Sequence, residues 1–268
     1  MKSIFNPNTI YEKILRNDIT MKEGIDILIS FVEKSENTRI RLDCLKILFN
    51  MKAQDSKIFK TLENCIISDE NDEIRVISAK FLLVHYLHVG EDCLKWAILN
   101  DKSSTFLKSI REILDGEEVD RYEVFYEAYL QRLNNIAKKY EIVSEEVPFL
   151  IDLELNIDRI KFIDWSQNSK LFYDKDVMFL TQDQHILELS VSLRNEIPPS
   201  INLLKNLEIL DLSCNNLKDL PNSLKDVTNL KILDLSWNNF NKVPDVLNEL
   251  NPITTINFQN DFHKQKSK

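Results

Sequence analysis

Glycine is scarce in this 268-residue sequence, and its scarcity excludes a class of functional sites. Only Gly24, Gly90 and Gly116 occur, and they lie far apart. GxxxxGK phosphate loops, GxGxxG dinucleotide turns and the GxSxG nucleophile elbow all need closely spaced glycines, because the backbone must turn tightly or approach the ligand closely. The chain can therefore build none of these sites.

Paired cysteines, an apolar leader and long hydrophobic runs are also missing. The four cysteines form no CxxC pair and lie in stretches of periodic apolar residues, where a free thiol acts as a small hydrophobe: Cys44, Cys65, Cys93 and Cys214. The N-terminus lacks the continuous apolar core of a signal peptide, and no apolar run approaches the roughly 20 residues that a bilayer requires. We therefore expect a cytoplasmic protein with structural thiols and no membrane span.

An excess of positive charge is the third absence. The chain has 34 Lys and Arg residues against 43 Asp and Glu residues, which gives a formal net charge of −9. Affinity for nucleic acid rests largely on Lys and Arg that neutralise phosphates, so we expect no nucleic-acid partner. A short basic tail, residues 263–268, is expected to be a solvated terminus, with a docking segment as the alternative.

A repeat of 23 residues is present in the C-terminal part. The segment NLEILDLSCNNLKDLPNSLKDVT is followed at once by NLKILDLSWNNFNKVPDVLNELN, and Leu233 minus Leu210 gives the period of 23. Alternating apolar residues in each unit predict a short strand with one buried face, and the asparagine can satisfy backbone groups where the chain turns. Such units stack on their neighbours and build one continuous core.

The pattern LxxLxLxxNxLxxLPxxLxxL resembles the leucine-rich repeat family, in its intracellular variety with an LP step. The first repeat matches it at Leu207, Leu210, Leu212, Asn215, Leu217, Leu220, Pro221 and Leu224. The second matches it at Leu230, Leu233, Leu235, Asn238, Phe240, Val243, Pro244 and Leu247. The resemblance implies an arc with a parallel sheet and a concave binding surface.

Weaker copies extend this register on both sides. Stepping back 23 residues from Leu210 gives Leu187, with Ser192 in place of the asparagine, and a further 24 residues give Ile163. The next step forward along the repeats ends at Ile256. We therefore predict about five parallel strands, near residues 162–165, 186–189, 209–212, 232–235 and 255–258.

The first half of the chain shows helical periodicity. Thr20 and Glu23 form a capping-box pattern that predicts a helix start. Residues 36–49 and 71–84 align with each other at a spacing of 34, and the second segment resembles the inner helix of a HEAT repeat through Asp72, Ile74, Arg75 and Ala79. Tetratricopeptide-like repeats and a generic helical bundle are the alternatives.

The predicted fold is mixed. An N-terminal all-α helical-repeat solenoid, residues 1–142, is fused to a C-terminal α/β leucine-rich repeat arc, residues 143–262, followed by the basic tail. Residues 117–140 have apolar side chains at spacings of three and four and predict a long amphipathic junction helix, whose aromatic stripe is expected to pack in the core.

Candidate chemical groups are few. His85 and His88 lie three residues apart on a predicted helix, but no third ligand clusters with them. The acidic clusters at residues 69–73 and 117–120 carry neither a DxDxDG calcium loop nor a companion nucleophile, so we interpret them as solvated helix starts. We predict no catalytic residue, no metal and no cofactor.

The strand face opposite the inward leucines is the predicted binding surface. One row along the five strands is apolar and ends in a threonine: Phe162, Ile186, Ile209, Ile232 and Thr255. The row beside it is acidic and ends in an asparagine: Asp164, Glu188, Asp211, Asp234 and Asn257. Stacked carboxylates about 4.8 Å apart repel one another unless a cation, or the Arg and Lys of a partner, offsets them. Trp237, a large aromatic outside the core pattern, is predicted to be an interface anchor.

These features favour a non-enzymatic scaffold or adaptor that binds another protein on the concave face. The matching partner is a basic or amphipathic segment. Resemblance alone adds a small GTPase or a signalling enzyme as a specific possibility. The alternative is an accessory protein or lyase-like enzyme that uses the HEAT-like half, and that class would carry a bound pigment or metal.

Overall fold

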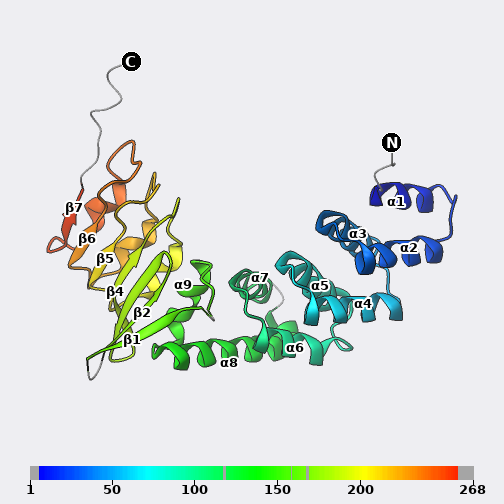
Figure 1. Cartoon of the computed structure of the whole chain (residues 1–268), viewed down its shortest axis with the longest axis horizontal. Helices are drawn as coiled ribbons and strands as arrows, with labels where there is room; N and C mark the ends of the chain where they lie inside the picture. Colours follow the sequence, from blue (N-terminus) through cyan, green and yellow to red (C-terminus); the bar gives the residue numbers. More distant parts are fainter. Residues whose placement is uncertain (1–5, 117–118, 158, 167–168, 259–268) are drawn as a thin grey trace, which may run out of the picture. The chain divides into compact units, whose positions relative to one another are not determined.

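The chain forms two compact units, Met1–Arg132 and Leu133–Lys268. The computed structural model describes residues 6–116, 119–157, 159–166 and 169–258. The first unit is helical and the second contains the sheet (Figure 1). The boundary falls inside the long helix α8, Glu123–Tyr140. Within these described ranges, no helix combines the length and the apolar character that a membrane crossing requires.

Seven helices precede α8 in the first unit. Their bounds are α1 Pro7–Leu15, α2 Met21–Lys34, α3 Thr38–Asn50, α4 Ser56–Ser68, α5 Asp72–His85, α6 Glu91–Asn100 and α7 Ser104–Leu114. A 3-10 turn, Val119–Tyr122, leads into α8. The described residues of this unit contain no strand, so the prediction of a helical first half is confirmed for them.

The helices of this unit begin at side-chain caps. Thr20 forms the predicted capping box, because its Oγ1 accepts from the Glu23 N–H at 3.2 Å while the Glu23 carboxylate accepts from the Thr20 N–H at 2.8 Å. Asn37, Asn71 and Ser103 cap α3, α5 and α7 in the same way. These caps satisfy backbone donors that lack a partner inside the helix.

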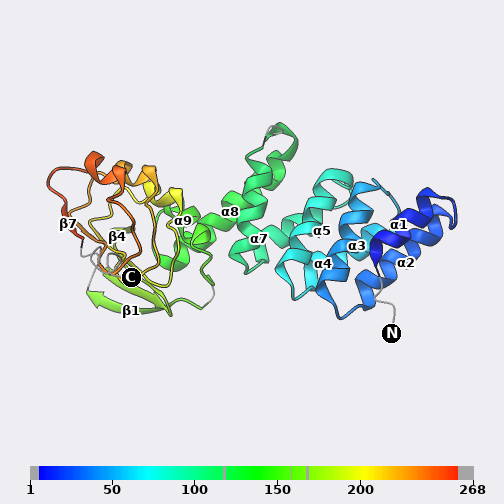
Figure 2. The same ribbon diagram turned by 90° about the horizontal axis from the view of Figure 1, so that it is seen from above.

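The helices form two layers. Helices α2 and α3 pack together as a pair, as do α4 and α5. Across the pairs, α3 packs against α5 and α5 against α7, while α2 packs against α4 and α4 against α6 (Figure 2). Each pair therefore buries its apolar stripe against the next pair, as in a stacked helical array.

The second unit contains one seven-stranded sheet with its strands in sequence order. The strands are β1 Lys161–Ser166, β2 Ser169–Asp174, β3 Val177–Gln182, β4 His185–Val191, β5 Ile209–Asp211, β6 Ile232–Asp234 and β7 Thr255–Asn257. β1 to β4 pair antiparallel as a meander, whereas β4 to β7 pair parallel. A short helix, α9 Val147–Asp152, precedes them.

The prediction of an all-parallel sheet is wrong for its first part. A strand does form near residues 162–165, but β2 and β3, which were not predicted, separate it from β4. The tight turn between β3 and β4 places Asp183 and Gln184 at φ 50° and 66°, which suits a two-residue hairpin with a right-handed strand twist. The direction of the chain reverses at each such turn, so β1 cannot be the first parallel repeat.

The core of the second unit lies on one face of this sheet. Leu189, Leu210 and Leu233 are buried and aligned across β4, β5 and β6. Pro198, Pro221 and Pro244 precede the 3-10 helices of the loops that follow these strands: Pro199–Leu203, Asn222–Asp226 and Asp245–Glu249.

An aromatic cluster extends this core under the meander. The rings of Phe172 and Phe179 stack at 5.0 Å between centroids, and Tyr140 at the end of α8 lies 5.4 Å and 6.2 Å from them. The end of α8 therefore covers the core side of β2 and β3.

Candidate functional site

The face of the sheet opposite the buried leucines, here called the open face, has two rows of aligned side chains. Paired residues of neighbouring strands point to the same side of a sheet, so the register defines each row. The first row follows β1 to β7: Ile163, Leu171, Leu180, Glu188, Ile209, Ile232 and Thr255. The second row runs beside it: Lys161, Tyr173, Met178, Ser190, Asp211, Asp234 and Asn257.

The part of the open face over β1 to β3 is apolar. Ile163 and Met178 are exposed, and Leu171, Leu180 and Tyr173 are partly exposed. A solvated face of an antiparallel sheet usually alternates with the core as polar against apolar, and this one does not. Sequence reasoning missed this patch because it did not predict β2 and β3.

The part over β5 and β6 is acidic. Asp211 and Asp234 are direct register partners on adjacent strands. Each carboxylate accepts the backbone N–H two residues later, from Ser213 and Ser236, at 2.9 Å. Burial opposes ionisation of Asp234, but hydrogen bonds from Ser236 and Asn257 outweigh it and lower the pKa of Asp234. Both aspartates therefore have a structural role within their own turns and still face solvent in part.

The predicted ladder of four carboxylates does not form. Leu189 pairs with Leu210, a separation of 21 residues, instead of Leu187 with Leu210. This shift places Glu188 beside Ile209 and places Ser190 beside Asp211, where the serine hydroxyl donates to the carboxylate at 3.3 Å. Two hydrogen-bond donors, Ser190 and Asn257, thus flank the two aspartates, which reduces the like-charge repulsion.

The shift arises because the turn after β4 is two residues shorter than the turns after β5 and β6. Asn215 Nδ2 donates to the carbonyl of Val191 at 2.6 Å, and Asn238 Nδ2 donates to that of Leu212 at 2.8 Å. Val191 therefore corresponds to Leu212, and the turn after β4 has no counterpart of Asn215. The prediction that Ser192 occupies the asparagine position is wrong for this reason.

Ile186 is the second correction to the predicted site, because it is fully buried. The register of β3 against β4 shifts at this point, where Leu180 pairs with Glu188 and Thr181 pairs with Ile186. Leu187 is the extra residue of this β-bulge, and a bulge reverses the alternation of side chains along the strand. Ile186 and Leu189 therefore both face the core, whereas Glu188 is exposed.

Phe162 and Asp164 are the third correction. Phe162 pairs with the buried Phe172, and their ring centroids lie 5.9 Å apart, so this side of β1 continues the core face of the sheet. Asp164 lies on the same side, paired with Lys170. Both side chains are exposed, but at the sheet edge and not on the open face. The antiparallel hairpins put Ile163 on the open face instead.

A row of exposed residues borders the open face where the strands end. Leu193, Cys214 and Trp237 occupy equivalent positions and have φ of 60°, 57° and 60°. Non-glycine residues seldom adopt this left-handed conformation, and such positions are enriched at functional sites. Val191 was predicted in this row but is buried. The predicted exposure of Trp237 is confirmed.

Other candidate chemistry has structural explanations. Burial raises the pKa of Cys44 to about 12 and that of Cys65 and Cys93 to about 11, as expected of structural thiols, whereas Cys214 is exposed. Among the described residues, no group of three or more His, Cys, Asp or Glu side chains could hold a metal ion. His85 stacks edge-on against Phe49 and Phe81, and burial lowers its pKa.

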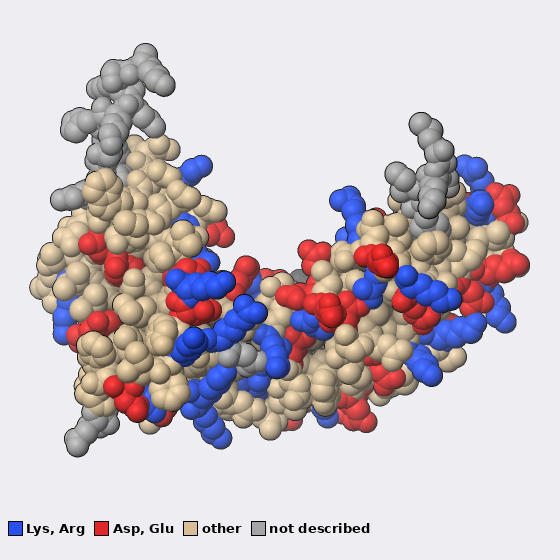
Figure 3. Space-filling model, in the orientation of Figure 1, with Lys and Arg blue, Asp and Glu red and all other residues tan. Residues whose placement is uncertain are grey.

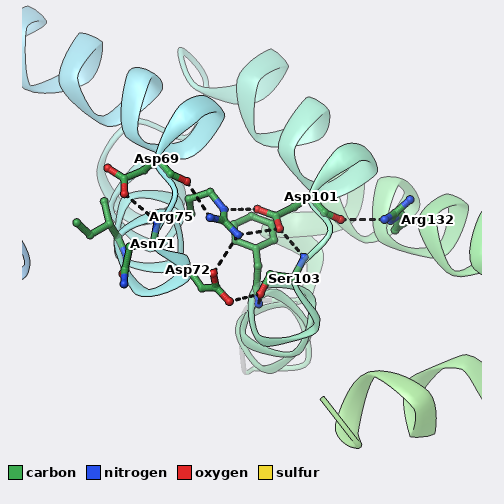
Figure 4. Close-up of polar contacts among 9 residues, drawn as sticks. Asp69, Asn71, Asp72, Arg75, Asp101, Ser103 and Arg132 are labelled. Carbon is green, nitrogen blue, oxygen red and sulfur yellow. Dashed lines mark hydrogen bonds and ion pairs between the residues drawn. The ribbon is translucent and has the colours of Figure 1, made fainter. Parts of the chain in front are cut away.

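The acidic residues before α5 belong to an ion-pair network inside the helical unit (Figure 4). Arg75 donates to the Asp101 carboxylate at 2.7 Å and to the Asp69 carbonyl at 2.8 Å. Asp72 accepts from the Ser103 hydroxyl at 2.6 Å. These contacts tie successive helices together. The second predicted acidic cluster falls at residues 117–120, and residues 117 and 118 lie outside the described part of the chain.

Charge of both signs is spread over the visible surface of each unit (Figure 3). Neither unit shows there the continuous basic surface that a phosphate backbone would need. Comparison with known proteins adds no name to this picture: no protein-family model matches the chain, and the search of curated proteins finds no match.

Proposed function

We propose that this chain is a non-enzymatic, cytoplasmic protein-interaction scaffold that binds a partner protein on the open face of its sheet. In this proposal the C-terminal unit is a leucine-rich repeat arc preceded by an antiparallel meander. The helical unit is a HEAT-like solenoid that supports it or offers a second surface. The observation that carries the proposal is the group of large apolar side chains exposed on and beside the open face.

The exposed side chains extend across the sheet. Ile163 on β1 is 51% exposed, Met178 on β3 46%, Ile232 on β6 40%, and Trp237 beyond β6 62%. Contiguous apolar surface on a soluble domain commonly marks an interaction site. Tryptophan is among the residues that most often dominate binding energy when a partner buries them.

The charges of the open face define the chemistry of the partner. Glu188 is the one charged residue in a row that is otherwise apolar from β1 to β6, and Asp211 and Asp234 lie in the neighbouring row. A segment with Lys or Arg beside apolar residues would satisfy both features. Complementary charge would mainly speed encounter and fix the orientation, while the apolar contacts would supply most of the affinity. A small GTPase or a signalling enzyme is a candidate partner by resemblance alone.

Affinity purification from the native cell with paired variants tests this proposal. The double variant Met178→Glu with Ile232→Glu places carboxylates on both parts of the open face. Ile253→Glu is the matched control, because Ile253 is 73% exposed in the loop before β7. We expect a protein retained by the parent and by the control, but not by the double variant. Equal recovery by all three would refute the open face as the binding site, and a bound pigment or metal would favour the enzyme-accessory alternative.

A further inference from the structure

β1 is an edge strand without the usual protection. It pairs only with β2, and among the described residues no backbone hydrogen bond outside the sheet involves β1. All six of its residues are exposed, including Phe162 at 57% and Trp165 at 66%. Edge strands are normally short, interrupted by proline or shielded by charge, because their free N–H and C=O groups accept further strands.

The apolar side chains of β1 point to both sides of the sheet. Ile163 extends the open face, while Phe162 extends the core face. An edge strand that presents apolar residues on both sides can gain burial on both sides when another strand is added. The other edge of the sheet, β7, has only three residues and offers a much shorter ladder.

We infer that two copies of this chain associate through β1, which pairs antiparallel with the β1 of the second copy about a two-fold axis. Antiparallel pairing aligns residues of the same face, so the register must place open-face positions opposite each other. Centring the axis on Ile163 meets this condition. Ile163 then contacts its own equivalent, and Phe162 lies opposite Asp164 of the second copy.

Charge complementarity supports the same register. The Lys170 ammonium lies 5.4 Å from the centre of the Phe162 ring. A carboxylate placed opposite Phe162 by the second copy therefore comes near a lysine that also contacts Glu141. The two-fold axis creates this contact twice. Because such a pairing closes on itself, it yields a dimer and not a fibre.

The added ladder is short compared with a standard interface, so we expect a concentration-dependent monomer–dimer equilibrium. Sedimentation equilibrium of the full chain over a concentration series measures it. The parent mass should rise from 31.5 kDa towards twice that value. Ile163→Lys and Ile163→Glu should each remain monomeric, since each places like charges together at the axis. An equimolar mixture of the two variants should recover the dimer, which a misfolded variant could not do.

Met178→Lys is the control that separates this inference from the proposed function. Met178 lies on the open face of β3, away from the edge, so this variant should still dimerise even if partner binding is lost. The inference is overturned if the parent stays monomeric at every concentration. It is also overturned if Ile163→Lys dimerises as well as the parent, or if the mixture of opposite charges does not associate.

Discussion

Arg75 and Asp101 form a largely buried ion pair that joins α5 to the end of α6. Arg75 Nε donates to Asp101 Oδ2 at 2.7 Å and Nη2 donates to Oδ1 at 3.2 Å (Figure 4). The two side chains are only 13% and 5% exposed. Arg41 and Asp69 form the same kind of pair one helix pair earlier. The network is therefore a repeated connection between successive helix pairs.

Removing Asp101 should strongly destabilise the helical unit. Asp101→Ala leaves the Arg75 guanidinium without its partner in a poorly solvated site, and breaking such a pair costs about 3–5 kcal/mol. Asp26→Ala is the control, because Asp26 and Lys57 form an exposed pair, and such pairs contribute roughly 0–1 kcal/mol. Urea unfolding of both variants measures the difference. Similar losses in the two would contradict the structural role of the Arg75 pair.

The bulge in β4 makes two isoleucines of one predicted row behave differently. Ile186 is fully buried, whereas Ile232 is 40% exposed. Ile186→Ala should lower the free energy of unfolding by about 2–5 kcal/mol, because it leaves a cavity in the core. Ile232→Ala should cost less than about 1 kcal/mol. Thermal unfolding of the two variants compares them directly, and equal losses would mean that Ile186 is not in the core.

Glu146 predicts a defined pH dependence. Its Oε2 accepts the Ile186 N–H and its Oε1 lies 2.9 Å from His185 Nδ1, in a buried site. Burial raises the pKa of Glu146 above its usual 4.5, and the hydrogen bonds from His185 and Ile186 oppose this only in part. The folded chain therefore binds this proton more tightly than the unfolded chain does.

The sign of the effect follows from linkage. The penalty for burying the carboxylate is absent below pH 4.5 and grows as the pH rises through the folded-state pKa. Glu146→Gln keeps an acceptor for the Ile186 N–H but does not titrate. The stability of the parent should therefore fall relative to that of Glu146→Gln as the pH rises from 4.5 to neutral. A difference that is constant with pH, or that changes in the opposite direction, would show that burial does not control this group.

The paired aspartates of the open face should affect association more than affinity. Asp211→Asn with Asp234→Asn removes two charges and retains acceptor oxygens for the Ser213 and Ser236 N–H groups. Binding to an identified partner should become slower and less dependent on salt, with little change in the unfolding temperature.

A charge-matched control isolates the position of those two aspartates. Asp226→Asn with Asp245→Asn removes the same charge from the 3-10 helices of the loops. Stopped-flow association over a range of salt concentrations compares the two double variants. An equal effect of both would assign the rate change to net charge alone.

The sequence predicted the parallel part of the sheet well and the meander poorly. Leu210 and Leu233 pair as the 23-residue period requires, because two complete copies of the pattern fix that register. The residues of β2 and β3 belong to no repeat, so no periodicity revealed them. Their absence from the prediction put Phe162 on the wrong face and hid Met178.

Two local irregularities also could not be read from the pattern. The bulge at Leu187 and the shortened turn after β4 each change the spacing, and a single sequence gives no signal for either. Both lie where the antiparallel strands meet the parallel strands. The exposure of Trp237, by contrast, follows from its place in a complete repeat.

The measurement that tests the central claim most directly is the dissociation constant of an identified partner for Trp237→Ala. Trp237 is exposed beside the open face, so its removal should leave the fold intact. If the partner binds the open face, we expect a loss of at least about 2 kcal/mol, roughly 30-fold in affinity, while Ile253→Ala binds as the parent does. Unchanged affinity for Trp237→Ala, or an equal loss for both variants, would contradict binding at this face.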